Sequence, residues 1–154
     1  MKRFLVVTAA MLLTVGAVYG YSTNVPFYLD NADSGGVGTG GTQAAYVGLH
    51  NNSSEDVVIT VAYFSADGVA LGPATGNTAV ITANASVSFR PGGDFQGASE
   101  SAAAAAIPDR PTPDGKLNGS IVISWTDGVE GTIQGREHQQ TDSFAAAYLL
   151  PPGQ

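Results

Sequence analysis

The sequence contains no cysteine. This absence excludes disulfides, thiolate metal ligands, cysteine nucleophiles and a lipid-modified cysteine anchor. A domain without disulfides has to obtain its stability from a buried core. The chain has 154 residues, which is enough for one such domain and leaves no room for a second one.

Basic residues are scarce. The sequence has six lysines and arginines against 13 acidic residues, and its formal net charge is −7 at pH 7. Nucleic-acid binding depends on Lys and Arg contacts to phosphate, and anionic membranes attract basic surfaces. The charge balance therefore argues against nucleic acid and against an anionic membrane as partners, and it is typical of a soluble acidic protein.

One long apolar run is present, at the N-terminus. Lys2 and Arg3 precede the apolar residues 4–18, and small residues at Val18 and Gly20 suit signal peptidase. The pattern predicts a signal peptide over residues 1–20 and a mature domain over 21–154, exported to the periplasm or the extracellular space. An uncleaved membrane anchor is the alternative, but the run is short for a span of about 20 residues.

The mature sequence shows no helical periodicity, and short runs that alternate apolar and polar residues recur between turn-forming residues. The clearest run, residues 56–65, has apolar residues on both faces and predicts a strand covered on both sides. Asp67-Gly68 and Asp127-Gly128 predict hairpin turns. These features predict an all-β antiparallel sandwich of about seven to nine strands. The expected strands are 24–29, an edge strand because of Pro26, and 44–51, 56–65, 69–71, 78–82, 86–89, 120–125, 130–136 and 143–150.

Two long segments interrupt the alternation. Residues 30–43 are rich in glycine, and residues 91–118 combine an alanine tract with closely spaced prolines. Loops of this length in a small domain are commonly functional. We therefore expect ligand binding there, and we expect that deletion of residues 100–110 spares folding but abolishes binding. The candidate binding residues are Gly36, Gly38, Phe95, Glu100 and Arg110.

The segments AYFSADG and ANASVSFRP, with an echo in ISWTDG, resemble immunoglobulin-like and fibronectin-III-like domains of secreted bacterial proteins. The resemblance covers residues 44–90 and again 120–136. The antibody-type cysteine pair around a tryptophan is absent. The resemblance implies a single immunoglobulin-like sandwich outside the cytoplasm, and it carries over no active-site residues.

Four motifs have a chemical interpretation beside a structural one. Residues 36–41 match G-x-G-x-x-G, but a strand follows instead of a helix, which argues against nucleotide binding. Asp30 and Asp33 could bind Ca²⁺, although the EF-hand spacing is absent and an Asx turn is the alternative. His50 and His138 are the only histidines, and a zinc or hydrolytic site would need carboxylates beside them. Trp125 could stack on a sugar or pack in the core.

These features together predict an exported, non-enzymatic sandwich protein with a structural, surface or ligand-binding role in the cell envelope or extracellular space. Its partner would be an envelope or extracellular ligand, and no cofactor is expected apart from Ca²⁺. A first alternative is a self-assembling subunit that pairs exposed edge strands or donates its N-terminal strand. A second alternative is a metal-dependent or hydrolytic enzyme that uses His50 and His138.

Overall fold

The computed structural model describes residues 20–32, 42–72, 77–92, 107, 110–141 and 143–152. These residues form nine β-strands and contain no helix. The strands are β1 (Tyr21–Leu29), β2 (Ala44–Asn51), β3 (Val57–Phe64), β4 (Ala70–Gly72), β5 (Thr78–Ile81), β6 (Ser86–Phe89), β7 (Asn118–Trp125), β8 (Ile133–Gln140) and β9 (Ala145–Leu149).

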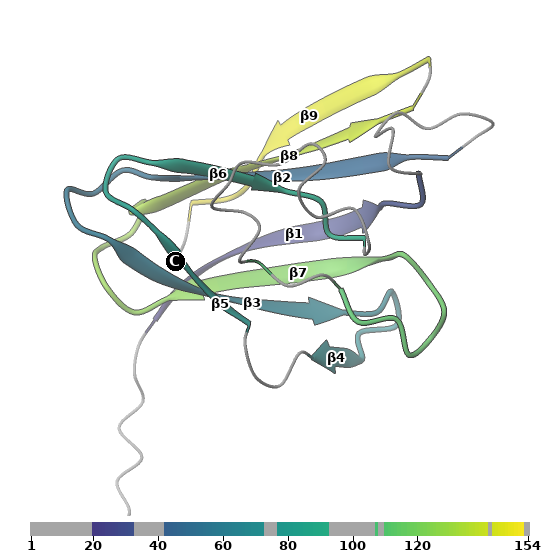
Figure 1. Ribbon diagram of the computed structural model, residues 1–154, viewed down its shortest axis with the longest axis horizontal. Helices are drawn as coiled ribbons and strands as arrows, with labels where there is room; N and C mark the ends of the chain where they lie inside the picture. Colours follow the sequence, from purple (N-terminus) through teal and green to yellow (C-terminus); the bar gives the residue numbers. More distant parts are fainter. Residues whose placement is uncertain are drawn as a thin grey trace, which may run out of the picture.

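The strands make two antiparallel sheets, as the alternating sequence predicts. The first sheet has the order β1-β7-β3-β4, and β5 also pairs with β3. The second sheet has the order β6-β2-β8-β9. Figure 1 shows them as two layers, with β9, β8, β2 and β6 above β1, β7 and β3. The longer strands inside and across these layers have one face toward the core and one face toward solvent, whereas β4 and β9, at the sheet edges, bury no residue.

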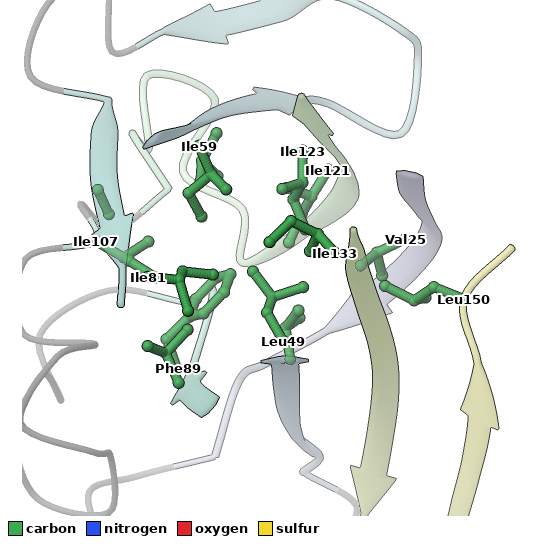
Figure 2. Packing of buried hydrophobic residues seen from close by; sticks show 14 of the residues in the cluster. Val25, Leu49, Ile59, Ile81, Phe89, Ile107, Ile121, Ile123, Ile133 and Leu150 are labelled. Carbon is green, nitrogen blue, oxygen red and sulfur yellow. The ribbon is translucent and has the colours of Figure 1, made fainter. Parts of the chain in front are cut away.

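The core lies between the two sheets and is built from alternate residues of facing strands. In β3, Val57, Ile59, Val61 and Tyr63 are buried, as is Trp125 at the end of β7. Each large aliphatic side chain buried in this way contributes about 1.5–3 kcal/mol. Figure 2 shows side chains of both sheets meeting in this layer, among them Leu49, Ile59, Ile81, Phe89, Ile123 and Ile133.

The prediction that β3 is covered on both faces is wrong. Val58 is 47 % exposed, and Thr60, Ala62 and Phe64 on the same face are partly exposed. β3 does lie inside its sheet, between β7 and the pair β4 and β5. No third layer of described residues covers its outer face, so the apolar residues there lie at the surface.

The two predicted hairpin turns have different outcomes. Gly68, with a φ of 80°, closes a hairpin, because β4 pairs with β3. Gly128 instead follows β7 of the first sheet and leads to β8 of the second sheet. The prediction of a hairpin at this second turn is therefore wrong. β8 begins at Ile133 and extends to Gln140, so the expected strand over residues 130–136 is displaced toward the C-terminus.

β1 is an edge strand, as Pro26 predicts, and it begins earlier than expected, at Tyr21. Its pairing with β7 is irregular between Val25 and Tyr28, which places Pro26 in a bulge. The predicted signal peptide, except for Gly20, and the alanine tract lie outside the described residues. No helix that could span a membrane occurs in the part of the chain that the structure describes.

Candidate functional site

A groove of about 660 Å³ lies on the outer face of the second sheet. Its floor is Gly48, in the middle of β2. The strand register places Ser88 of β6 on one side of Gly48 and Arg136 of β8 on the other. Tyr46 and His50 precede and follow Gly48 on the same face, because alternate residues of a strand share a face. A glycine among four larger side chains leaves a hollow in the sheet surface.

The Arg136 side chain lies across this floor. A Cβ atom added to Gly48 would lie 3.6 Å from Cγ and 3.8 Å from Nε of Arg136, which is ordinary van der Waals contact. Arg136 is exposed, and no carboxylate of the described residues forms an ion pair with it. The groove therefore presents a guanidinium group to whatever enters it.

The two ends of the groove carry aromatic and hydroxyl groups. At one end, Nδ1 of His50 lies 2.9 Å from Oγ of Ser86. At the other end, the ring of Tyr46 lies 6.0 Å from the ring of His138. The Nε2 atom of His138 is buried and has no hydrogen-bond partner. A buried polar atom of this kind is commonly satisfied by a bound water.

Charge distinguishes the groove from the rest of the surface. The other described cations each lie beside a carboxylate: Arg90 beside Asp30, Arg110 beside Asp114, and Lys116 beside Asp67. None of the described residues that line the groove is acidic. In a chain with a net charge of −7, this face is therefore a local site of positive charge, suited to an anionic group.

Glu137 lies on the opposite, buried face of β8. Its Oε1 atom accepts a hydrogen bond of 2.7 Å from Gln139, whereas its Oε2 atom has no partner. Burial raises the pKa of Glu137 to about 7, and the hydrogen bond from Gln139 opposes this shift. The register places Val47 of β2 and Tyr148 of β9 beside Glu137, and neither carries a charge that could compensate for it.

Asp30, one of the calcium candidates, is buried at the end of β1. Its carboxylate forms an ion pair with Arg90 and accepts hydrogen bonds from the backbone amides of Gly92, at 2.9 Å, and Ala45, at 3.3 Å. These contacts tie the end of β1 to β2 and to the end of β6. Asp33 lies outside the described residues. Within the described ranges, no three His, Asp or Glu residues gather as a metal site.

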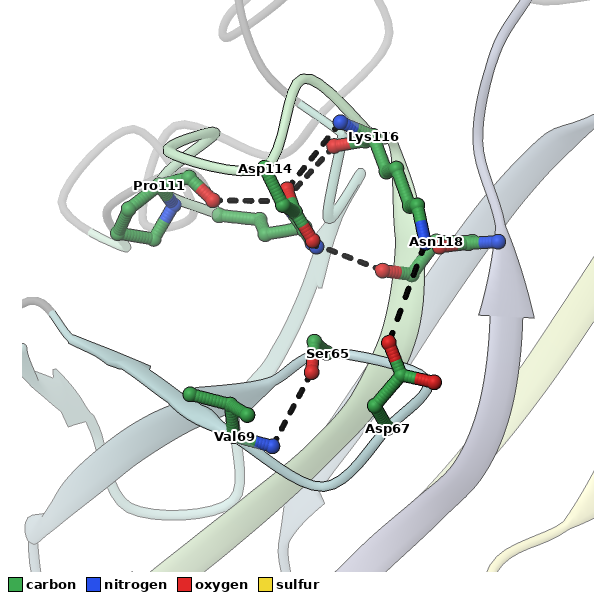
Figure 3. A network of polar contacts seen from close by, with 8 residues as sticks. Ser65, Asp67, Val69, Pro111, Asp114, Lys116 and Asn118 are labelled. Atoms are coloured by element: carbon green, nitrogen blue, oxygen red, sulfur yellow. Dashed lines mark hydrogen bonds and ion pairs between the residues drawn. The ribbon is translucent and has the colours of Figure 1, made fainter.

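Arg110, a candidate binding residue, is buried within its own loop. It donates hydrogen bonds to Asp114, at 2.7 and 3.0 Å, and to the carbonyls of Pro111, Lys116 and Asn118 (Figure 3). The hydrogen bond from Arg110 lowers the pKa of Asp114 to about 2.

The segment around Arg110 also contributes to the interior, because Ile107 is buried in the core. Deletion of residues 100–110 would remove both Ile107 and Arg110, so we no longer expect it to spare folding. The other loop candidates, Gly36, Gly38, Phe95 and Glu100, lie outside the described residues.

Sequence reasoning identified two groove residues, His50 and His138, and missed Gly48 and Arg136. The signal was present in part, because Tyr46, Gly48 and His50 alternate along one strand. The missing information was the pairing of β2 with β8, which places Arg136 opposite Gly48.

No family model, curated protein or solved structure matches the chain. The groove is therefore the basis for assigning a function. Its guanidinium group can donate hydrogen bonds, and its imidazole, hydroxyl and amide groups can both donate and accept them. The contact between Ser86 and His50 has the geometry of a nucleophile and a base, but the lining that the structure describes offers no carboxylate to orient His50.

Proposed function

We propose that the protein is an exported, non-enzymatic, immunoglobulin-like sandwich that binds a carboxylate-bearing saccharide in the groove over Gly48. The main support is the Arg136 guanidinium, which has no acidic partner among the described residues and lies in a groove whose described lining contains no carboxylate. A guanidinium group binds a carboxylate through two parallel hydrogen bonds, and this geometry favours a carboxylate over a neutral group.

The other lining groups support a saccharide as the carrier of that carboxylate. Ser86 and Ser88 contribute hydroxyl groups, and Gln134 and Gln140 contribute amides. Such groups both donate and accept hydrogen bonds, as sugar hydroxyls do. Tyr46 offers an aromatic ring at one end, against which a sugar ring can pack. The groove lies open on a sheet face, so a chain of sugars can lie across the strands.

Export is supported by the N-terminal sequence, and the immunoglobulin-like assignment by nine strands in two antiparallel sheets. The role of the frame is to hold β2, β6 and β8 in a fixed register. A site on paired strands is more rigid than one on loops, so the groups that contact the ligand are already in place before it binds.

The test is calorimetric titration of the purified protein with polygalacturonate and with neutral dextran. We expect binding of polygalacturonate only, weakened by salt. Arg136→Gln should lower the affinity about tenfold or more, because a charge-assisted hydrogen bond contributes about 1.5–3 kcal/mol. Gly48→Val should fill the floor and abolish binding while the protein stays folded.

Lys116→Gln is the matched control, because it removes a cation whose side chain is 53 % exposed and lies outside the groove. It should leave the affinity unchanged. Equal affinities of the wild type and Arg136→Gln, or equal losses in Arg136→Gln and Lys116→Gln, would refute the proposed site.

A hydrolase is the second candidate, because Oγ of Ser86 lies 2.9 Å from Nδ1 of His50. The double variant His50→Ala/His138→Ala tests it against acetylated and unmodified polygalacturonate. Hydrolysis by the wild type that disappears in the double variant would establish the enzyme. Binding without hydrolysis, or activity that the double variant retains, would rule out this use of the two histidines.

A further inference from the structure

β9 is an exposed edge strand, and none of its residues is buried. Leu149 is 83 % exposed, and Phe144, just before the strand, is 63 % exposed. Soluble proteins usually protect such edges with charged residues, prolines or a covering segment. The sequence of β9 is AAAYL, which has neither charge nor proline. Figure 1 shows β9 at the rim of the second sheet, beyond β8.

The hydrogen bonds at the two ends of β9 establish which backbone groups face outward. Leu150 donates its N–H to Gly135 at 2.9 Å, and Phe144 accepts from the N–H of Thr141 at 2.7 Å. The direction of backbone groups alternates along a strand, so Ala146 and Tyr148 also face β8. The N–H and C=O groups of Ala145, Ala147 and Leu149 therefore point away from the sheet, and no described strand pairs with them.

We propose that β9 pairs with β9 of a second copy of this chain, antiparallel, about a two-fold axis through Ala147. In this register Ala147 faces Ala147, and Ala145 of each copy faces Leu149 of the other. All of these are hydrogen-bonded pairs, so every outward N–H and C=O of the strand finds a partner.

The side chains complement one another in the same register. On the outer face, Leu149 of one copy lies opposite Ala145 of the other. On the inner face, Tyr148 lies opposite Ala146. Each large side chain therefore meets a small one, which permits close packing on both faces. A shift of the pairing toward the C-terminus would bring Pro151, which has no N–H, opposite the strand.

Charge also favours a second copy at this edge. Two acidic chains repel one another, so contact is least costly where charge is absent. β9 itself carries no charged residue. Pairing of identical edges is isologous, and it closes after two copies. We therefore expect a dimer and no filament through this strand.

The pairing has a consequence for the groove. A two-fold axis perpendicular to the sheet leaves the outer faces of both copies on the same side, so two grooves lie along one continuous sheet. Leu149 belongs to both the groove lining and the seam. A long ligand could then engage both copies, which raises its avidity. This consequence rests on the proposed function, whereas the pairing itself does not.

The experiment measures the mass of the purified protein by light scattering over a concentration series, without ligand. We expect a monomer–dimer equilibrium with no larger species. Leu149→Lys should give a monomer at all concentrations, because it places a charge in the seam at a position that is 83 % exposed. Val129→Lys is the matched control, since Val129 is 65 % exposed and lies outside β9, and it should still dimerise.

Cysteine variants test the register, because the chain contains no cysteine. In the proposed dimer, the two Ala147 Cα atoms lie about 5.5 Å apart, within the range of a disulfide. The two Ala145 Cα atoms lie roughly 14 Å apart, beyond that range. Oxidation should therefore cross-link Ala147→Cys and leave Ala145→Cys monomeric on a denaturing gel. A strict monomer, a dimer that survives Leu149→Lys, or equal cross-linking of both cysteine variants would overturn the proposal.

Discussion

Replacement of Glu137 by glutamine should stabilise the protein at alkaline pH and remove a pH dependence that the wild type has. Glu137 is fully buried, and its Oε2 atom has no hydrogen-bond partner. Glutamine has nearly the same shape and cannot ionise. Its carbonyl oxygen can still accept the hydrogen bond that Gln139 donates at 2.7 Å.

The sign of the effect follows from the direction of the pKa shift. Burial raises the pKa of Glu137 from 4.5 to about 7. The folded protein therefore holds this proton more tightly than the unfolded chain does, so the contribution of Glu137 to stability is fully present below about pH 4.5. As the pH rises from about 4.5 to about 7, Glu137 ionises first in the unfolded chain, and this ionisation stabilises the unfolded chain relative to the folded protein. The folded state loses about 3 kcal/mol relative to the unfolded state by pH 8.

The assay is chemical denaturation of the wild type and Glu137→Gln at several pH values between 4 and 8. The difference between their free energies of unfolding cancels every titrating group that the two proteins share. This difference should grow in favour of the variant by about 3 kcal/mol from pH 4 to pH 8, which corresponds to roughly 10 °C in Tm. A difference that stays constant with pH would refute the assignment of a raised pKa to Glu137.

Two further features of the interior can be tested, the buried ion pair of Arg90 with Asp30 and the close backbone approach at Gly119. Arg90→Met leaves the buried carboxylate of Asp30 without its guanidinium partner. It should lower the free energy of unfolding, measured with denaturant, by about 3–5 kcal/mol. Adding Asp30→Asn to this variant removes the unpaired charge and should recover part of the loss. Gly119→Ala should lower the free energy of unfolding by at least about 3 kcal/mol, because its φ is 149° and an added Cβ would lie 2.0 Å from the carbonyl oxygen of Phe64. Gly68→Ala, at a φ of 80° with nothing within 4 Å, should cost only about 1 kcal/mol, and similar losses in both glycine variants would contradict the steric explanation.

The strands were largely predictable, whereas their distribution between the two sheets was not. The bounds of β2 and β6 agree with the predicted ranges 44–51 and 86–89, because alternation and turn residues are local signals. Asp67-Gly68 and Asp127-Gly128 are alike in sequence, yet the first closes a hairpin and the second connects the two sheets. A turn sequence determines that the chain reverses. Which sheet the next strand joins depends on distant apolar faces that no local pattern contains.

The candidate site was predictable only in the residues that are rare. His50 and His138 were identified because the chain has two histidines. Gly48 and Arg136 are unremarkable until the register of β2 and β8 places them side by side. Arg110 was assigned to ligand binding because its loop is long, but its guanidinium is used within the loop. Loop length indicated where irregular structure lies, and it did not indicate which side chains remain available.

The outer faces of the two sheets explain why the groove forms on the second one. On the first sheet, Val58 faces Val80, Ala62 faces Val122, and Thr60 faces Ser124, so short side chains of similar size cover the middle of this face. The sizes differ only toward the end of β3, where Phe64 faces Ser120. On the second sheet, Gly48 has no side chain while its neighbours carry rings, hydroxyls and a guanidinium. A hollow forms on a sheet face where paired residues differ in size in this way. The polar lining then follows from alternation, because the residues that face away from the core are those free to be polar. The same register that buries Val47 and Leu49 therefore places the hollow, and the Arg136 guanidinium beside it, in solvent.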